Sequence, residues 1–237
     1  MNLFWDEEVP YMTIFDEHHM TYILLMGVLL LLMVTQVEKV KKHAEIIRKG
    51  ILMVSIIQQV ALYSWYIFET GFDISESLPF HISRISSILG IIFLWTKNNK
   101  VMHVLFYFGL FAYGSFFYPS RVYPMYHLMG LSFFINHAIT ILLPIFSAIA
   151  YDWRPKLNRM FKAYGWFLAY FVFVYFLNPL IDGNYFYLKH RPFFGHLPDS
   201  IYVPGVLLFT LIIFGIGYYI AQVIVDIRAR KRQESPL

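Results

Sequence analysis

Long runs of apolar residues, separated by short polar segments, organise this sequence. A helix that crosses the hydrocarbon core of a bilayer needs about 20 mostly apolar residues, roughly 17–25. Seven segments meet this requirement, at about residues 20–37, 51–68, 78–96, 101–118, 126–150, 161–181 and 201–225. The pattern therefore predicts an all-α polytopic membrane protein, with seven transmembrane helices forming a single domain over residues 1–237.

The composition agrees with this class. The 237 residues are 58% hydrophobic, 20% aromatic and only 14% charged, whereas a soluble domain is roughly 45–50% apolar and about 25% charged. The chain has no cysteine, which excludes disulfides, iron–sulfur sites and a thiol nucleophile. The first apolar run lacks the basic segment of a cleaved signal peptide, because acidic residues such as Asp6 and Glu7 precede it.

The basic residues set the expected orientation. Fifteen of the nineteen lysines and arginines fall in alternate polar segments: after the first, third and fifth spans and in the C-terminal tail. The opposite segments hold only Arg121, Lys189 and Arg191, and Arg84 lies inside the third span. The positive-inside rule then places the N-terminus outside and the C-terminus in the cytoplasm. The net charge of +4 is therefore a topology signal, and nucleic acid is not expected as a partner.

Few polar or ionisable residues lie within the spans, and each is a functional candidate because the bilayer makes it costly. His81 and Arg84 are three residues apart in the third span and so share a helix face. In the predicted topology these residues gather in the outer half of the membrane, where they could line one cavity. The candidates are His81, Ser83 and Arg84 in the third span, Asn136 and His137 in the fifth, Asn178 in the sixth and Glu69 at the end of the second.

Simpler roles compete with a catalytic one. A histidine within a span can serve helix packing, and Gln58 and Gln59 are typical of interhelical hydrogen bonding. Arg84 could be a counter-ion of Glu69 or bind a lipid phosphate. No HxxxH or HExxH spacing is present, so neither a metal nor another cofactor is expected.

The outer segment at residues 182–200 is unusually aromatic for a loop. Asp182-Gly183-Asn184 is a strong turn signal directly after a helix, and Tyr185, Phe186 and Tyr187 follow it. The pattern favours a lid folded onto the bundle, although a loop lying among lipid headgroups fits equally well.

Several short motifs, in their order along the chain, resemble the YwaF-type bacterial integral membrane proteins. They are Ser77-Leu78-Pro79-Phe80-His81-Ile82, Lys97-Asn98-Asn99, Phe133-Phe134-Ile135-Asn136-His137, Asp152-Trp153-Arg154-Pro155 and Asn178 with Gly183-Asn184-Tyr185-Phe186-Tyr187-Leu188. The resemblance covers about residues 60–215 and implies a bacterial cell membrane protein. The chain is also distantly similar to the transmembrane protein 164 acyltransferases, which transfer acyl chains to ether lysophospholipids. Those enzymes are grouped with the androgen-induced intramembrane hydrolases, which use a threonine and a histidine.

The resemblance implies that His81 and His137 are motif histidines. The acyltransferases use a cysteine beside the histidine of the third-span motif, but this chain has Ser83 after Ile82. A thiol acyl-enzyme is therefore impossible here, and Ser83 is the candidate replacement.

The leading hypothesis is a lipid acyltransferase or ester hydrolase acting in the outer half of the bilayer, with membrane lipids as its partners. His81 or His137 would be the general base, Ser83 or a bound hydroxyl the nucleophile, and Arg84 the group that holds a phosphate or an oxyanion. Asn136, Asn178, Glu69, Asn184 and Tyr185 would complete the substrate site. A permease for a small solute or lipid is the second hypothesis, and a non-catalytic membrane scaffold is the third.

Overall fold

The computed structural model describes the backbone of residues 2–234 and the side chains of residues 2–226, and within these limits it is 74% helix with no strand. The helices are α1 (Glu17–Thr35), α2 (Val37–Lys42), α3 (Ala44–Phe68), α4 (Ile74–Ser77), α5 (Ile82–Thr96), α6 (Asn99–Phe108), α7 (Leu110–Phe117), α8 (Leu128–Ala150), α9 (Leu157–Ile181), the 3-10 turn η1 (Tyr185–Tyr187) and α10 (Asp199–Glu234). The all-helical prediction is confirmed.

Six helical stretches in the described residues are long and apolar enough to cross a membrane: α1, α3, α6 together with α7, α8, α9 and α10 up to Asp226. Together they make the chain a multi-pass membrane protein. The third predicted span, residues 78–96, is the one of the seven that is not among these six. Its helix α5 begins only at Ile82 and has 15 residues, a length of about 22 Å at 1.5 Å per residue. Residues 78–81 are not helical, partly because proline disfavours helix in the residue before it, here Leu78.

The stretch predicted as the fourth span is interrupted at Gly109, between α6 and α7. A Cβ atom at this position would lie 2.9 Å from the Leu105 carbonyl oxygen and 3.0 Å from Cγ2 of Thr140 on α8. Glycine therefore allows the α6–α7 junction to approach α8 closely.

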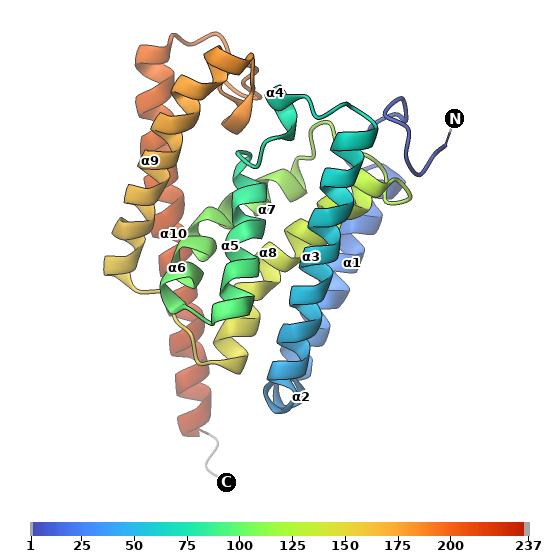
Figure 1. Cartoon of the computed structure of the whole chain (residues 1–237). Helices are drawn as coiled ribbons and strands as arrows, with labels where there is room; N and C mark the ends of the chain where they lie inside the picture. The colour runs from blue at the N-terminus through green and yellow to red at the C-terminus, as the bar shows by residue number, and fades with distance from the viewer. Residues whose placement is uncertain (1, 235–237) are drawn as a thin grey trace.

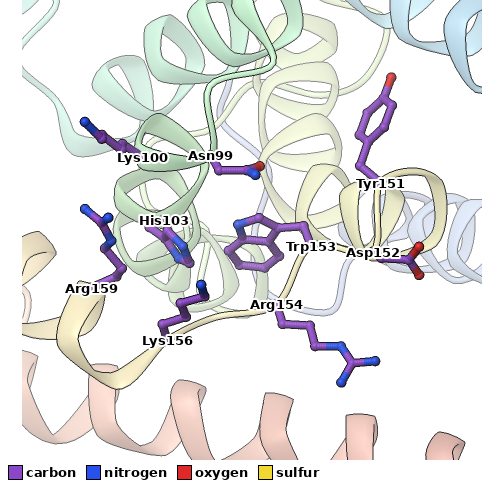
Figure 2. A pocket seen from close by; sticks show the side chains of 9 residues that line it. All are labelled: Asn99, Lys100, His103, Tyr151, Asp152, Trp153, Arg154, Lys156 and Arg159. Atoms are coloured by element: carbon purple, nitrogen blue, oxygen red, sulfur yellow. The ribbon is translucent and has the colours of Figure 1, made fainter.

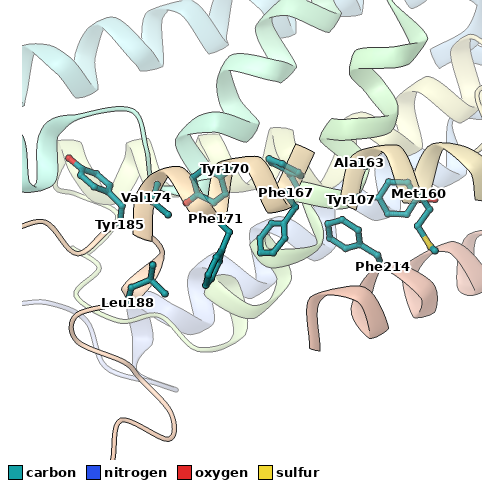
Figure 3. Close-up of a cluster of buried hydrophobic side chains, with 11 residues drawn as sticks. Tyr107, Met160, Ala163, Phe167, Tyr170, Phe171, Val174, Tyr185, Leu188 and Phe214 are labelled. Carbon is teal, nitrogen blue, oxygen red and sulfur yellow. The ribbon is translucent and has the colours of Figure 1, made fainter. Parts of the chain in front are cut away.

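The helices form a bundle (Figure 1) and pack around several clusters of buried hydrophobic side chains. α8 lies against α3 and α5, and α6 lies between α5 and α9. The cluster in Figure 3 joins α6, α9 and α10 through Tyr107, Phe167 and Phe214, all fully buried, and extends to Tyr185 beyond α9. This continuity ties residues 182–188 to the bundle.

The two ends of the bundle carry different segments. Figure 1 shows the start of α1, the short α4 and the segment between α9 and α10 at one end. The opposite end carries α2, the α5–α6 turn and the α8–α9 loop, which hold many of the basic residues. We call these the acidic-loop end and the basic-loop end.

Candidate functional site

The candidate site is built around residues 74–81, which comprise the short helix α4 and the irregular turn between α4 and α5. Backbone polar groups outside regular helices are costly in a membrane unless the protein satisfies them. Three of them are bound by tyrosine phenols. The Tyr185 hydroxyl donates to the Ile74 carbonyl (2.7 Å) and accepts from the Leu78 amide (3.0 Å), and the Tyr170 hydroxyl donates to the Phe80 carbonyl (2.8 Å).

Burial raises the pKa of the Tyr185 phenol to about 12. Tyr185 therefore remains protonated at neutral pH and keeps its donor for Ile74. The side chain is fully buried, so it acts as a fixed support between residues 182–200, which we call the outer segment after their predicted place, and the start of α5.

Arg84 supports the same segment from α5. Its guanidinium donates to the carbonyl oxygens of Glu76 and Leu78, the latter at 2.9 Å, and to the Tyr66 hydroxyl. It also lies 4.6 Å from the centre of the Tyr66 ring. Arg84 is only 9% exposed, so its donors are directed into the protein.

Of the alternatives for Arg84, an ion pair with Glu69 is not found among the described residues. The Glu69 carboxylate instead accepts from the Glu7 amide at 3.2 Å. Glu69 therefore anchors the N-terminal segment, while Arg84 serves backbone carbonyls. The two carbonyl oxygens and the Tyr66 hydroxyl lie close together and match the planar donor geometry of the guanidinium.

His81 is the residue immediately before α5, and its side chain does not cap the helix. The imidazole lies between two tyrosines of the outer segment, with ring centres 4.9 Å from Tyr185 and 6.1 Å from Tyr187. Within the described residues no hydrogen bond to this imidazole is found, and His81 is partly exposed. Its ring nitrogens are therefore available for proton transfer.

The first turn of α5 also has free donors. The His81 carbonyl accepts from the amides of Arg84 (2.9 Å) and Ile85 (3.1 Å). Among the described residues the amides of Ile82 and Ser83 have no partner. A helix N-terminus with unpaired amides carries partial positive charge and favours an anionic group.

Ser83 and Asn136 meet across the α5–α8 contact. The Asn136 amide donates to the Ser83 carbonyl (3.2 Å), and its buried Oδ1 has no partner among the described residues. This bond fixes the first turn of α5 against α8.

His137 follows Asn136 but belongs to a different packing face. Its Nδ1 donates to the Phe133 carbonyl (2.8 Å), and its ring centre lies 3.9 Å from that of Phe133. Because Nδ1 carries the proton, the lone pair is on the buried Nε2, which has no partner in the described chain. Phe133 in turn stacks on Tyr22, so His137 faces the α1 side whereas Asn136 faces α5.

Asn178 and Asn184 shape the outer segment. Asn178 Nδ2 donates to the Tyr185 carbonyl, and the Tyr185 amide donates to Asn178 Oδ1, both at 2.9 Å. Asn184 Oδ1 accepts from the amides of Lys189 (3.0 Å) and His190 (2.9 Å). The segment is thus folded down onto the bundle as far as Leu188, which is buried.

The structure brings together His81, Ser83, Arg84, Asn136, Asn178 and Tyr185 through these contacts. Asn184 does not contact these residues through its side chain, which stabilises the turn that carries Tyr185. In the described residues no hydrogen bond joins His137 or Glu69 to the others. Sequence reasoning missed Tyr66 and Tyr170. Only their position in predicted spans, where a phenol needs a partner, could have indicated them.

The mid-membrane glutamines link three helices. Gln58 donates to Ser132 Oγ on α8 (2.6 Å), and Gln59 donates to Ser87 Oγ on α5 (2.9 Å). Among the described residues no group of three or more His, Asp or Glu side chains is placed to hold a metal ion.

The fold and these contacts define a multi-pass α-helical membrane protein with a polar site at one end of its bundle. Within that class the chain belongs to the TMEM164 family, whose sequence model matches residues 14–218. No curated protein matches the chain, and no solved structure matches it.

Proposed function

We propose that this protein is a lipid acyltransferase or ester hydrolase whose site is the start of α5. The observation that carries the proposal is the combination found there: the unpaired His81 imidazole, the unpaired amides of Ile82 and Ser83, and the Ser83 hydroxyl. A base, an anion-stabilising pair of amides and a hydroxyl within three consecutive residues suit acyl transfer.

The proposed reaction exchanges one ester bond for another. His81 takes the proton from the attacking hydroxyl, which belongs to Ser83 or to a bound lipid acceptor. The oxygen of that hydroxyl attacks the ester carbonyl of the acyl donor, and the amides of Ile82 and Ser83 stabilise the oxyanion. The old acyl–oxygen bond then breaks, and His81 returns the proton to the leaving alkoxide. With no cysteine in the chain, any acyl-enzyme would be an oxygen ester on Ser83. A lipid hydroxyl or water, deprotonated by His81, then attacks this ester, takes the acyl group and leaves Ser83 as a hydroxyl that regains its proton from His81.

The other candidate residues act in positioning. Arg84, Asn136, Asn178 and Tyr185 hold the backbone around His81 through the hydrogen bonds described above. His137 is the alternative base, because the lone pair of its Nε2 is free. Glu69 and Asn184 hold the neighbouring segments.

An apolar groove on another face of α9 supports a lipid substrate. It measures about 410 Å³ and lies between α9 and α10, lined by residues including Phe171, Tyr175 and Leu207. α9 is also the helix whose Phe173 packs against Phe80, next to His81 (ring centres 4.9 Å). An acyl chain could lie in this groove with its polar end toward the acidic-loop end.

The proposed setting follows from the charge pattern. We propose that the chain crosses the membrane seven times and that the short helix α5 is the third crossing. The acidic-loop end would be outside and the basic-loop end in the cytoplasm. The motifs around His81, Asn136 and Asn178 further support the YwaF-type bacterial branch of the family and the bacterial cell membrane as the location.

The test is an acyl-transfer assay with the purified protein in nanodiscs. A diacyl phospholipid serves as donor and an ether lysophospholipid as acceptor, and mass spectrometry measures the acylated product and released fatty acid. We compare wild type with His81→Ala, His137→Ala and Ser83→Ala, and with His190→Ala as the control, since His190 is an exposed histidine of the outer segment.

The variants separate the possible roles. Loss with both His81→Ala and Ser83→Ala assigns Ser83 as nucleophile, whereas loss with His81→Ala alone assigns the acceptor hydroxyl. Loss with His137→Ala alone moves the base to α8. Equal product from wild type and all three variants, at equal protein levels, would overturn the proposal and favour the permease or the scaffold.

A further inference from the structure

A second polar site lies at the basic-loop end, at the opposite end of α5 from the candidate site. It is a pocket of about 300 Å³ between the start of α6, the α8–α9 loop and the start of α9. Figure 2 shows its side chains arranged around His103 of α6 and Trp153 of the loop. The Asp152-Trp153-Arg154-Pro155 motif builds one wall, and no step of the proposed acyl transfer uses it.

The pocket has a strong excess of positive charge. Four cations line it, Lys100, Arg154, Lys156 and Arg159, against one carboxylate, Asp152. None of the four cations forms an ion pair within the described residues. Figure 2 shows the Asp152 carboxylate on the far side of Trp153 from His103. The four cations therefore give the pocket a positive potential that no carboxylate of the described residues offsets by direct pairing.

Two buried ring nitrogens lie at this wall, and the Trp153 indole N–H is a donor. His103 is 5% exposed and Trp153 6% exposed, and their ring centres are 5.2 Å apart. His103 Nδ1 and Trp153 Nε1 have no hydrogen-bond partner among the described residues. A buried indole N–H normally finds an acceptor, so its presence without one points to an acceptor that the protein itself does not supply.

The wall is held in place rather than loosely exposed. The Trp153 amide donates to the Ser147 carbonyl at the end of α8 (3.2 Å), and Gln222 of α10 donates to the Pro155 carbonyl (2.9 Å). α6 and α9 both begin at the pocket, at Asn99 and Leu157, so their N-terminal dipoles add to the positive potential.

From this arrangement we infer that the pocket binds a phosphate group through Lys156, Arg159, His103 and Trp153. Guanidinium and ammonium groups with added N–H donors match the several acceptor oxygens of a phosphate. Two sources share this chemistry: the headgroup of an anionic lipid in the leaflet at the basic-loop end, and a free phosphate or soluble phosphate ester.

The experiment measures binding by the full chain in nanodiscs. One arm compares bilayers of phosphatidylglycerol with phosphatidylcholine and counts retained lipid by native mass spectrometry. The other arm adds inorganic phosphate to protein in phosphatidylcholine and follows the unfolding temperature. The test variant is Lys156→Gln with Arg159→Gln. The control is Lys42→Gln with Lys49→Gln, which removes the same charge from exposed positions at the same end.

We expect the test variant to bind at least tenfold more weakly than wild type and the control to bind within twofold of it. Retention of phosphatidylglycerol without a response to inorganic phosphate identifies the lipid headgroup, and a response to inorganic phosphate identifies a soluble ligand. No binding by wild type in either arm, or equal loss in test and control variants, overturns the inference. If the double variant does not fold, His103→Gln replaces it, with a loss of at least threefold expected and an unchanged affinity overturning the inference.

Discussion

Asn178 and Tyr185 exchange two hydrogen bonds, each 2.9 Å long, across the turn that follows α9. The pair is buried, with Asn178 5% exposed and Tyr185 fully buried. Tyr185 then binds the backbone at Ile74 and Leu78 and lies against the His81 ring. One side-chain amide on α9 thus determines where the outer segment meets the start of α5.

Replacing Asn178 with alanine should release this connection. The substitution leaves the buried amide and carbonyl of Tyr185 unpaired, which costs about 1–3 kcal/mol for each unsatisfied group. We expect a lower unfolding temperature in detergent and faster proteolysis between residues 182 and 198. Asn158→Ala is the matched control, because Asn158 is exposed on the same helix. Equal stability of the two variants would show that the reciprocal bonds do not hold the segment.

Arg84 and Tyr66 should behave as a coupled pair. Arg84→Lys keeps the charge but loses the fork that reaches the Glu76 and Leu78 carbonyls and the Tyr66 hydroxyl. We expect a loss of about 2–4 kcal/mol in the free energy of unfolding. Tyr66→Phe alone should cost less, and the double variant should show a coupling energy of about 0.5–3 kcal/mol. Additive losses in chemical denaturation would contradict this arrangement.

Lowering the pH should weaken the attachment of the outer segment by protonating Asp182. Lys189 donates to the Asp182 carboxylate at 2.6 Å and, with its charge, lowers the pKa of Asp182 below its usual 3.8. Because the folded state has the lower pKa, the stabilisation is present above pH 3.8 and is lost as the pH falls through the folded value. Both groups are exposed enough that the effect is small.

Hydrogen exchange of residues 183–190 can detect this loss, comparing wild type with Asp182→Asn at each pH. Wild type should be better protected at pH 6, and the two proteins should become equal at the acid end. Equal protection at pH 6 would show that the pair contributes nothing to the segment.

The sequence predicts the class of protein because that class depends on average composition over long windows. Mean hydropathy and the number of lysines and arginines in each segment are such averages. The start of the third span was not, because hydropathy does not register that Leu78 and Phe80 lie in a bend. The bend exists because Tyr170, Tyr185 and Arg84 satisfy its backbone groups, and these partners come from other parts of the chain.

The candidate site was predictable as a set of residue types but not as a geometry. The predicted topology placed Asn136 and His137 in the same half of the membrane, yet neighbouring helical residues point about 100° apart. Asn136 reaches Ser83 on α5, whereas His137 stacks on Phe133. The partners of Arg84 could not be predicted either, because a sequence does not show which carbonyls a guanidinium will meet.

The absence of cysteine makes the crossing number of the chain directly measurable. Single cysteines at Glu8, Lys42, Lys100 and His190, all exposed positions, can be labelled in intact cells with a membrane-impermeant maleimide. With seven crossings and the N-terminus outside, Glu8→Cys and His190→Cys should react at once, and Lys42→Cys and Lys100→Cys only after permeabilisation. If α5, at 15 residues, does not cross, Lys100→Cys becomes reactive from outside and His190→Cys becomes protected. The joint behaviour of these two positions therefore decides whether the short helix is a span.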